Sequence, residues 1–296
     1  MTRPVGTVAV LGTGHMGGAM AGTLRRNGFD VVVWNRTRVR AESVAAEADV
    51  RVAANPGEAV AEADVVVSSL ADDPAVLEAY TGADGAAAGM RTGTVALETS
   101  TIAPETVRTV APVVAEGGGV LLDAPVSGSV AFAQQGQLTF MVGGDERTAE
   151  PARPVLDALG AKVLFLGGLG NGAVAKLAVN ALVHAIDVGL SEALVLAERA
   201  GVERSAIYDV FAGGAAAAPF VLYKRAAFEH PEGSSTAFSL DLMAKDLDLI
   251  LQLAEAVGAP MAQAGLNRET VHRALAAGFS GRDMSAVAEY LRTRAG

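Results

Sequence analysis

The feature that most constrains the fold of this chain is a glycine-rich turn close to the N-terminus. Residues 7–12 (TVAVLG) are apolar and β-branched, which is typical of a buried parallel strand, and a helical run follows the turn. The turn, GTGHMG, places Gly12, Gly14 and Gly17 in a G-x-G-x-x-G pattern between strand and helix, as that pattern requires. Free N–H groups at a helix N-terminus bind anions, so the pattern predicts a site for the pyrophosphate of a dinucleotide.

Each glycine of the turn has a separate expected role. Gly12 allows the tight turn, Gly14 lets the backbone approach the pyrophosphate, and Gly17 lets the helix pack on the strand. His15 and Met16 fill variable positions of the same turn. We therefore count both among the cofactor-binding residues, without assigning any chemistry to His15.

The end of the second predicted strand indicates which dinucleotide is bound. An NAD-specific site has an aspartate or glutamate here, whereas residues 31–35 (VVVWN) end in Asn35 and continue with Arg36 and Thr37. A guanidinium can hold a ribose 2′-phosphate through its fork of donors, and a carboxylate would repel it. We therefore predict Asn35, Arg36 and Thr37 as cofactor-binding residues, and NADP(H) in preference to NAD(H). Arg38 is expected to lie on a solvated helix face.

Helical and strand-like segments then alternate, which predicts a doubly wound parallel sheet. We expect further strands at residues 50–53, 65–70, 94–98 and 120–124, and helices at about 39–48, 56–62, 74–80 and 104–116. Ligands bind at the carboxyl ends of such strands, where Leu70 and Thr101 stand, although ordinary turn chemistry explains these loops equally well. Residues 138–143 and 163–167 are predicted strands around a helix at 146–159, and we expect them to extend the sheet.

The second half of the chain is helical and begins with a long proline-free run, residues 171–199. Asn171 is the predicted N-cap of this helix and Gly201 its predicted stop. Lys176 and Asn180 interrupt the apolar run four residues apart, so both side chains lie on one face. A lysine and an amide on an otherwise apolar helix are costly unless they are used. Further helices are expected at residues 204–211, 220–228, 240–257, 260–277 and 285–292.

These elements predict an α/β Rossmann-type doubly wound sheet followed by an all-α C-terminal domain. We place the boundary in the glycine-rich stretch before the long helix, with a dinucleotide-binding domain at residues 1–167 and a helical domain at 168–296. We expect the active site between the two domains, because ligand sites often lie at domain interfaces.

Composition argues against several classes of protein. The net charge of −10 argues against a nucleic-acid partner, and the absence of cysteine excludes disulfides and thiolate metal sites. The first apolar run is too short for a signal peptide, and polar side chains on the long helix argue against a membrane span. We therefore expect a cytoplasmic protein. His230 and His272 have no partners at metal-ligand spacing, so no metal is predicted.

Four motifs together resemble the β-hydroxyacid dehydrogenase family, within the 6-phosphogluconate dehydrogenase superfamily. They are LGTGHMGGAMAGTL from Leu11, DAPVSGSVAFAQQGQLTFMVGG from Asp123, GNGAVAKLAVN from Gly170 and KDLDL from Lys245. STIAPET from Ser100 is a further match. The family includes 3-hydroxyisobutyrate dehydrogenase and glyoxylate/succinic semialdehyde reductase, and the resemblance covers nearly the whole chain.

The resemblance implies catalytic and substrate-binding roles. Lys176 stands at the position of the family's catalytic lysine and Asn180 at that of its helper amide, while Ser127 and Gly128 fall in the loop that binds the substrate carboxylate. As hydride passes between the nicotinamide and the carbonyl carbon, Lys176 can donate a proton to the carbonyl oxygen in reduction and accept it in oxidation. Burial would bring its pKa down from the free value of about 10.4 toward working pH.

The resemblance also extends to the cofactor and to assembly. Thr101 and Lys245 match cofactor-binding positions of the family, and Leu70 is grouped with them. Phe238 and Asp241, just before the Lys245 motif, could line the substrate pocket, although core packing explains them equally well. Family members associate through the helical domain, so a homodimer or homotetramer is expected.

Two departures from the family's pattern bear on the substrate. Many relatives have a second asparagine where this chain has Ala181, and a second glycine where it has Ser129 in the carboxylate-binding loop. Together with the Asn-Arg-Thr segment, both changes are closer to the glyoxylate/succinic semialdehyde reductase branch. They leave the choice among small hydroxyacids and semialdehydes open.

Two other functions are compatible with a dinucleotide-binding fold. An imine reductase of related fold typically lacks the lysine found here at Lys176, and a non-catalytic NADP-binding sensor would be expected to have lost Lys176 or Asn180. Both residues are present, which favours the dehydrogenase. His184 and Asp187, farther along the same helix, are interpreted as packing or interface residues.

Overall fold

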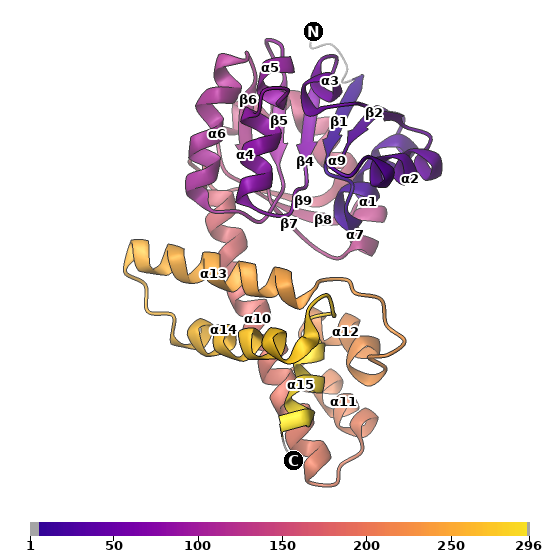
Figure 1. The fold of residues 1–296 in the computed structure, drawn as a ribbon, viewed down its shortest axis with the longest axis vertical. Helices are drawn as coiled ribbons and strands as arrows, with labels where there is room; N and C mark the ends of the chain where they lie inside the picture. The colour runs from indigo at the N-terminus through magenta and orange to yellow at the C-terminus, as the bar shows by residue number, and fades with distance from the viewer. Residues whose placement is uncertain (1–5, 295–296) are drawn as a thin grey trace. The chain divides into compact units, whose positions relative to one another are not determined.

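The computed structural model describes residues 6–294, which form two compact units that divide between Lys176 and Leu177 (Figure 1). The first unit is built on a parallel sheet, and the second consists of helices. The predicted fold class, a Rossmann-type sheet followed by an all-α part, is therefore confirmed.

The main sheet of the first unit has six strands, all of them parallel. Its order is β3-β2-β1-β4-β5-β6, so the direction of winding reverses between β1 and β4, where ligands bind in such sheets. The register aligns Leu11, at the end of β1, with Trp34 of β2 and Ser68 of β4. The strands are β1 Thr7–Leu11, β2 Asp30–Trp34, β3 Arg51–Val52, β4 Val65–Ser68, β5 Val95–Glu98 and β6 Val120–Asp123.

Helices cover both faces of this sheet, which is why its strands are apolar at nearly every position. Val8 and Val10 of β1 belong to one core with α1 and α2, and Ala9 and Leu11 belong to the other with α3 to α6. The period of two along the strand assigns successive side chains to opposite faces. The helices are α1 His15–Arg26, α2 Arg38–Ala48, α3 Pro56–Val60, α4 Asp73–Thr81, α5 Ala86–Gly89 and α6 Pro104–Glu116.

The expectation that later strands extend this sheet is wrong. β7 (Val126–Ser127), β8 (Leu138–Val142) and β9 (Gly160–Phe165) form a separate three-stranded sheet, antiparallel between β7 and β8 and parallel between β8 and β9. An isolated bridge between Asp123 and Gly143 links it to β6. A proline stands two residues after β6, and because it has no N–H to donate, it does not continue the ladder.

The helices around the second sheet are short. The predicted helix at 146–159 is divided by a 3-10 turn, because two prolines, Pro151 and Pro154, fall inside it. A further short helix after β7 was not predicted. The bounds are α7 Val130–Gln134, α8 Glu146–Ala149, the 3-10 turn Glu150–Ala152 and α9 Arg153–Leu159.

The long helix α10 spans Asn171–Arg199, and its first turn is held by Asp123 at the end of β6. The N–H groups of Gly170 and Ala173 each donate to the Asp123 carboxylate at 2.8 Å. The Asn171 amide instead donates to the Leu166 carbonyl, so Asn171 is not the N-cap that we predicted. A carboxylate distant in sequence satisfies donors that a cap residue usually satisfies.

Glycines on both sides of Asn171 allow this close approach. Gly170 has φ of +94°, and a Cβ on Gly172 would lie 2.9 Å from the carboxylate of Asp123. Burial raises the pKa of Asp123, against the effect of the backbone hydrogen bonds that it accepts. At the other end of α10, Gly201 takes φ of +90°, which agrees with the predicted stop.

By length and composition α10 could cross a membrane, with a mean hydropathy of 1.5 over its most apolar window. The core helix of a globular unit meets the same criterion. Leu177, Val188 and Leu194 of α10 are buried, and so are the polar side chains of Asn180 and Asp187. These positions are those of a core helix, but only 39% of the most apolar window of α10 is buried, and Leu182 and Leu196 are exposed.

The other helices of the second unit follow the prediction closely, with one exception. The predicted helix at 260–277 ends earlier, in a π turn where Gly278 takes φ of +91°. That conformation interrupts a right-handed helix. The elements are α11 Arg204–Gly213, α12 Pro219–Glu229, α13 Leu240–Val257, α14 Ala262–Ala274, the π turn Leu275–Phe279 and α15 Ala286–Arg294.

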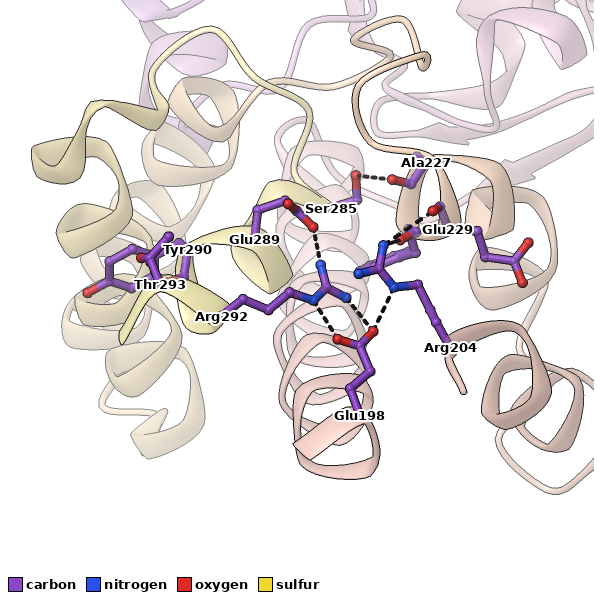
Figure 2. A network of polar contacts seen from close by, with 10 residues as sticks. Glu198, Arg204, Ala227, Glu229, Ser285, Glu289, Tyr290, Arg292 and Thr293 are labelled. Atoms are coloured by element: carbon purple, nitrogen blue, oxygen red, sulfur yellow. Dashed lines mark hydrogen bonds and ion pairs between the residues drawn. The ribbon is translucent and has the colours of Figure 1, made fainter. Parts of the chain in front are cut away.

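An ion-pair network joins the end of α10 to α11 and α15 (Figure 2). The Glu198 carboxylate accepts hydrogen bonds from Arg292 at 2.6 and 2.7 Å and from Arg204 at 2.7 Å. Partial burial acts to raise the pKa of Glu198, but the two guanidinium groups outweigh it and lower the pKa. The bidentate pair with Arg292 fixes the C-terminal helix against α10.

The bonds from Gly170 and Ala173 to Asp123 predict a large loss of stability when that carboxylate is removed. We expect Asp123→Ala to lower the free energy of unfolding by about 2–4 kcal/mol, because two buried N–H groups lose their partner. Urea denaturation followed by circular dichroism measures the change. The control is Asp157→Ala, which removes an exposed ion pair with Arg153 and should cost at most about 0.5 kcal/mol. Equal effects of the two changes would contradict the capping role of Asp123.

Candidate active site

The turn between β1 and α1 is shaped by three glycines with different surroundings. A Cβ on Gly12, where φ is +93°, would lie 2.2 Å from the Ser69 carbonyl oxygen, and one on Gly17 would lie 2.0 Å from the Gly12 carbonyl oxygen. A Cβ on Gly14 would meet nothing within 4 Å. Gly12 and Gly17 are therefore required by the packing of the turn itself, whereas Gly14 borders open space on the side where a ligand can approach.

The N-terminus of α1 has the features of an anion site. Gly14 is the N-cap and supplies no side chain to cap the first turn. The Thr13 hydroxyl is buried without a hydrogen-bond partner among residues 6–294. Thr13, Gly14 and His15 line an open groove, while Met16 packs against the core. Uncapped N–H groups and an unused buried hydroxyl fit the pyrophosphate of a dinucleotide.

Asn35, Arg36 and Thr37, the three predicted residues at the end of β2, have different environments. The Asn35 amide accepts from the Thr13 N–H at 3.1 Å and donates to the Thr37 carbonyl at 3.0 Å, so it joins two loops. Arg36 is exposed and lines a pocket of about 360 Å³. Thr37 is the N-cap of α2, but its hydroxyl makes no capping bond. Arg38 pairs with Glu42 on the surface of α2, as expected.

A buried hydrogen-bond network joins the ends of β4 and β5. The Glu98 carboxyl accepts from the Ser68 hydroxyl and the Ser100 N–H, both at 2.7 Å. The Ser100 hydroxyl accepts from the Leu70 N–H at 2.8 Å, and the Ser68 hydroxyl also bonds Tyr80 at 2.8 Å. Glu98 is 1% exposed. This carboxyl therefore fixes the loop of Leu70 and lies three residues before Thr101.

The predicted carboxylate-binding loop lies at the start of the second sheet. Ser127 pairs with Thr139 in the antiparallel ladder of β7 and β8. Gly128 takes φ of +136°, a conformation that favours glycine over residues with a side chain. The following residue stands at the start of α7. Ser129 is the N-cap of α7, and its side chain makes no capping bond. The hydroxyls of Ser127 and Ser129 are both on partly exposed residues.

The polar face of α10 is matched by acidic and basic residues of α13. The Asn180 amide donates to the Asp246 carboxylate at 2.6 Å, and both residues are buried. Lys245 is partly exposed, and its ammonium lies 2.9 Å from the other oxygen of Asp246. Lys176 is partly buried on α10, one turn before Asn180.

The two residues before the Lys245 motif have different environments. The ring of Phe238 lies 6.0 Å from that of His184, centroid to centroid, and is partly buried. Asp241 is exposed and accepts hydrogen bonds from Ser280 and Gly281, both at 2.7 Å, which lower its pKa. Asp241 thus has a structural partner, and its place in a substrate pocket stays a prediction.

Each unit brings a subset of the predicted residues together. In the first unit the glycine turn and Asn35 meet, and in the second Asn180, Lys245 and Phe238 lie around Asp246 and His184. The sequence prediction did not single out Asp246, although it follows Lys245 directly in KDLDL. It also overlooked Glu98, an acid that ends the apolar strand VALE. An acidic residue closing an apolar run is the signal that could have found Glu98, whereas Asp246 lies inside a helical segment and carries no such signal.

Comparison with known families defines the class of protein. Residues 7–168 match the NAD-binding domain of 6-phosphogluconate dehydrogenase, and residues 170–291 match the family described as NAD-binding of NADP-dependent 3-hydroxyisobutyrate dehydrogenase. With the glycine turn and its uncapped helix, these matches define a dinucleotide-dependent oxidoreductase with an NAD(P)-binding domain.

Individual relatives narrow the class. The chain is 33% identical over 293 residues to glyoxylate/succinic semialdehyde reductase 2, chloroplastic, of Arabidopsis thaliana, covering 97% of this chain and 80% of that protein. It is 35% identical over 286 residues to the NAD-dependent L-serine dehydrogenase of Pseudomonas aeruginosa, covering 95% and 96%. The solved 3-hydroxyisobutyrate dehydrogenase of Mycobacterium tuberculosis with L-serine superimposes with a TM-score of 0.82 at 34% identity, covering 98% and 100%.

The chain therefore belongs to the β-hydroxyacid dehydrogenase family of the 6-phosphogluconate dehydrogenase superfamily. It is a dehydrogenase or reductase that acts on CH–OH donors, as the resemblance in the sequence implied. The names of its relatives include both an NAD-dependent enzyme and an NADP-dependent family, so they do not decide the cofactor.

The buried Glu98 predicts a pH dependence of stability. Burial raises the pKa of Glu98 from 4.5 to about 7, against the hydrogen bonds from Ser100 and Ser68. The folded state then holds the proton more tightly than the unfolded state, so the contribution of Glu98 to stability is highest below pH 4.5. It falls by about 3 kcal/mol as the pH rises to 7 and changes little above it.

Glu98→Gln removes this contribution, so the difference in unfolding free energy between wild type and variant should change by about 3 kcal/mol between pH 4.5 and 8. Urea denaturation at a series of pH values measures it. Glu105→Gln, a change at an exposed surface carboxylate, serves as the control and should leave the pH profile unaltered. A Glu98→Gln profile parallel to that of the wild type would rule out proton binding by Glu98 in this range.

Proposed function

We propose that this chain is an NADP(H)-preferring enzyme that interconverts a small β-hydroxyacid, or 2-hydroxyacid, and its semialdehyde or oxo acid. The observation that carries the proposal is the placement of Lys176 and Asn180 one turn apart on α10, with the Asn180 amide bonded to the buried Asp246 carboxylate. A lysine beside an amide of fixed orientation is suited to move a proton at a carbonyl oxygen.

Lys176 is the proposed general acid and base. A bound nicotinamide dinucleotide supplies the hydride to the carbonyl carbon in reduction and takes it back in oxidation. Lys176 Nζ gives its proton to the carbonyl oxygen in reduction, which yields the hydroxyl group and a neutral amine. The partial burial of Lys176 supports this role, because desolvation disfavours the charged ammonium. Asn180 bonds the reacting oxygen or the lysine without itself titrating.

The carboxylate of the substrate is assigned to the loop of Ser127, Gly128 and Ser129. Two hydroxyls and the backbone N–H groups of this loop can bind a carboxylate, and so fix the reacting carbon relative to the hydride. The Ser129 hydroxyl makes no capping hydrogen bond to α7, which supports the assignment. Phe238 is proposed to line the apolar side of the substrate, whereas the bonds of Asp241 to Ser280 and Gly281 favour a structural role for it.

The proposed cofactor site follows the C-terminal ends of β1, β2, β4 and β5. Gly12, Gly14, His15, Met16 and Gly17 form the pyrophosphate turn, with Leu70, Thr101 and Lys245 assigned to the nicotinamide half. Arg36 and the hydroxyl of Thr37, which makes no capping bond, would hold the 2′-phosphate of NADP(H). The position of Arg36 at a pocket beside β2 supports this preference. Asn35 acts indirectly, by holding the turn and Thr37 together.

The proposal extends to assembly, domain limits and location. On α10, Leu182 and Leu196 are 65% and 73% exposed, which supports a homodimer or homotetramer through the helical part. We keep 1–167 and 168–296 as the domain limits and a cytoplasmic location. Ala181, Ser129 and the Asn-Arg-Thr segment favour the glyoxylate/succinic semialdehyde branch for the substrate. No metal is proposed.

The role of Lys176 predicts a loss of turnover without a loss of cofactor binding. With glyoxylate or succinic semialdehyde and NADPH, Lys176→Ala should lower kcat by about 10²- to 10⁴-fold, the usual range for a general acid. NADPH affinity, measured by fluorescence titration, should stay within about 3-fold of the wild type, since uniform binding is retained. Lys162→Ala, on the exposed side of β9, is the matched control.

Other outcomes discriminate between the functions considered. Unaltered turnover of Lys176→Ala would sink the catalytic assignment. A panel of C3–C4 hydroxyacids, semialdehydes and cyclic imines completes the test. Turnover of cyclic imines alone would indicate an imine reductase, and NADPH binding without turnover of any member of the panel would indicate a sensor.

The cofactor preference predicts a selective effect at Arg36. Arg36→Ala should raise the KM for NADPH by about 10- to 100-fold, because a charge-assisted bond to the 2′-phosphate is lost. The KM for NADH, which lacks this phosphate, should not change. Arg153→Ala, whose guanidinium pairs with Asp157 on α9, is the control. Equal KM values for NADPH in Arg36→Ala and wild type would contradict the preference.

A further inference from the structure

A buried polar cluster in the second unit includes a histidine that the proposed mechanism does not use. Asn180 and His184 stand one turn apart on α10, and Asp246 faces them from α13. Their exposed fractions are 6%, 1% and 1%. A carboxylate this deeply buried is costly unless donors and positive charge surround it.

The geometry brings both α10 side chains to the same oxygen atom. Asn180 Nδ2 lies 2.6 Å from Asp246 Oδ2, and His184 Nε2 lies 3.7 Å from that same oxygen. The Lys245 ammonium lies 2.9 Å from Oδ1. His184 is thus in ion-pair range of Asp246, although its Nε2 makes no hydrogen bond among residues 6–294. A proton on Nε2 places positive charge near the carboxylate at this distance.

The ionised form of Asp246 decides which way the Asn180 amide turns. A carboxylate can only accept hydrogen bonds, so the amide must present its NH₂ group to Asp246, and its carbonyl oxygen must face elsewhere. A protonated Asp246 could donate instead, and the amide could then turn over. Asn180 therefore offers a fixed acceptor only while Asp246 keeps its charge.

His184 is the more buried of the two basic partners of Asp246. Burial acts to raise the pKa of Asp246, but the contacts with His184 and Lys245 outweigh it and lower the pKa. Lys245 is 22% exposed at its side chain, against 2% for His184, and we have assigned Lys245 to the cofactor. When Lys245 turns to a bound dinucleotide, His184 is the partner that stays with the carboxylate.

Neighbouring groups hold the histidine ring in place. The Phe238 ring, from the segment before α13, lies 6.0 Å away and is tilted by 32°. Within residues 6–294, the ion pairs that involve His184 or its partner are with Asp246 and, across it, Lys245, both on α13. Asp187, three residues farther along α10, interacts instead with Lys224 and Asp283.

We propose that His184 is a positioning residue: it keeps Asp246 as an ionised acceptor and thereby fixes the Asn180 amide with its carbonyl oxygen free for the lysine or the substrate. This inference rests on the proposed role of Asn180. His184 touches neither the substrate nor the cofactor in this scheme. It acts on turnover through Asp246 alone.

A pair of amide variants tests the proposal. A glutamine at 184 can extend its NH₂ group toward Asp246, whereas the shorter asparagine cannot reach it. We therefore expect His184→Asn to lower kcat by about 10- to 100-fold, as for a misplaced catalytic group, while the KM for NADPH changes little. His184→Gln should retain most of the wild-type kcat. The assay uses NADPH with glyoxylate and with succinic semialdehyde.

The pH profile supplies a readout that simple packing would not change. In His184→Asn the acidic limb of kcat should move to higher pH, because Asp246 then takes up a proton more readily. Ser191→Ala, a change at a fully buried hydroxyl of the same helix, should leave the limb in place. Melting temperatures establish that each variant is folded. If His184→Asn does not fold, His184→Gln carries the test alone, and a folded His184→Gln with a loss of kcat of about 10- to 100-fold would overturn the inference.

A double-mutant cycle separates this inference from the function on which it rests. If His184 acts through Asn180, His184→Gln and His184→Asn should have equal kcat in an Asn180→Ala background. Unequal kcat there, or equal loss for both variants in the wild-type background, would overturn the inference. If Lys176→Ala and Asn180→Ala left turnover intact, the proposed function itself would fail. If Asn180→Ala lowered kcat while His184→Asn kept the kcat and the pH profile of the wild type, only the role of His184 would be overturned.

Discussion

The position of Lys176 depends on one interaction, the capping of α10 by Asp123. The carboxylate at the end of β6 accepts the N–H groups of Gly170 and Ala173 and so fixes where the long helix begins. The rotation of the helix follows from its first turn, because each later residue advances by a constant angle. A single contact between a strand end and a helix start therefore sets the direction of Lys176.

The sequence predicted what depends on local chemistry and missed what depends on tertiary contacts. Gly12 and Gly17 were predictable because the strand–turn–helix context requires residues without a Cβ, and the structure shows the close contacts directly. The cap of α10 was not predictable. Asn171 is of a residue type that favours the N-cap position, but the carboxylate that accepts from the first turn is that of Asp123, 47 residues before Gly170. The separate second sheet escaped for a similar reason, since strand pairing is a non-local choice.

The candidate site residues also divide into those visible from the local sequence and those visible only from tertiary contacts. Lys176 and Asn180 stood out as polar side chains on an apolar helix, and their roles came from the resemblance. Their buried partner Asp246 is visible only once α10 and α13 are packed together. Glu98 and Asp246 are both buried carboxyl groups, but their surroundings act differently. Burial raises the pKa of Glu98 to about 7, whereas the contacts with His184 and Lys245 lower the pKa of Asp246.

The amide of Asn35 has a consequence for how such an enzyme can evolve. It ties the pyrophosphate turn at Thr13 to the residue that caps α2, while Arg36 stands outside this tie on the exposed surface. With the role that we propose for Arg36, exchange of this one surface side chain would change the preference between the two dinucleotides and leave the hydrogen bonds of Asn35 in place. Replacement of the Asn35 amide by a carboxylate would affect both the binding of a 2′-phosphate, which a carboxylate repels, and the hydrogen bond to Thr37, which a carboxylate cannot donate. Relatives that are named for different dinucleotides can thus share one fold.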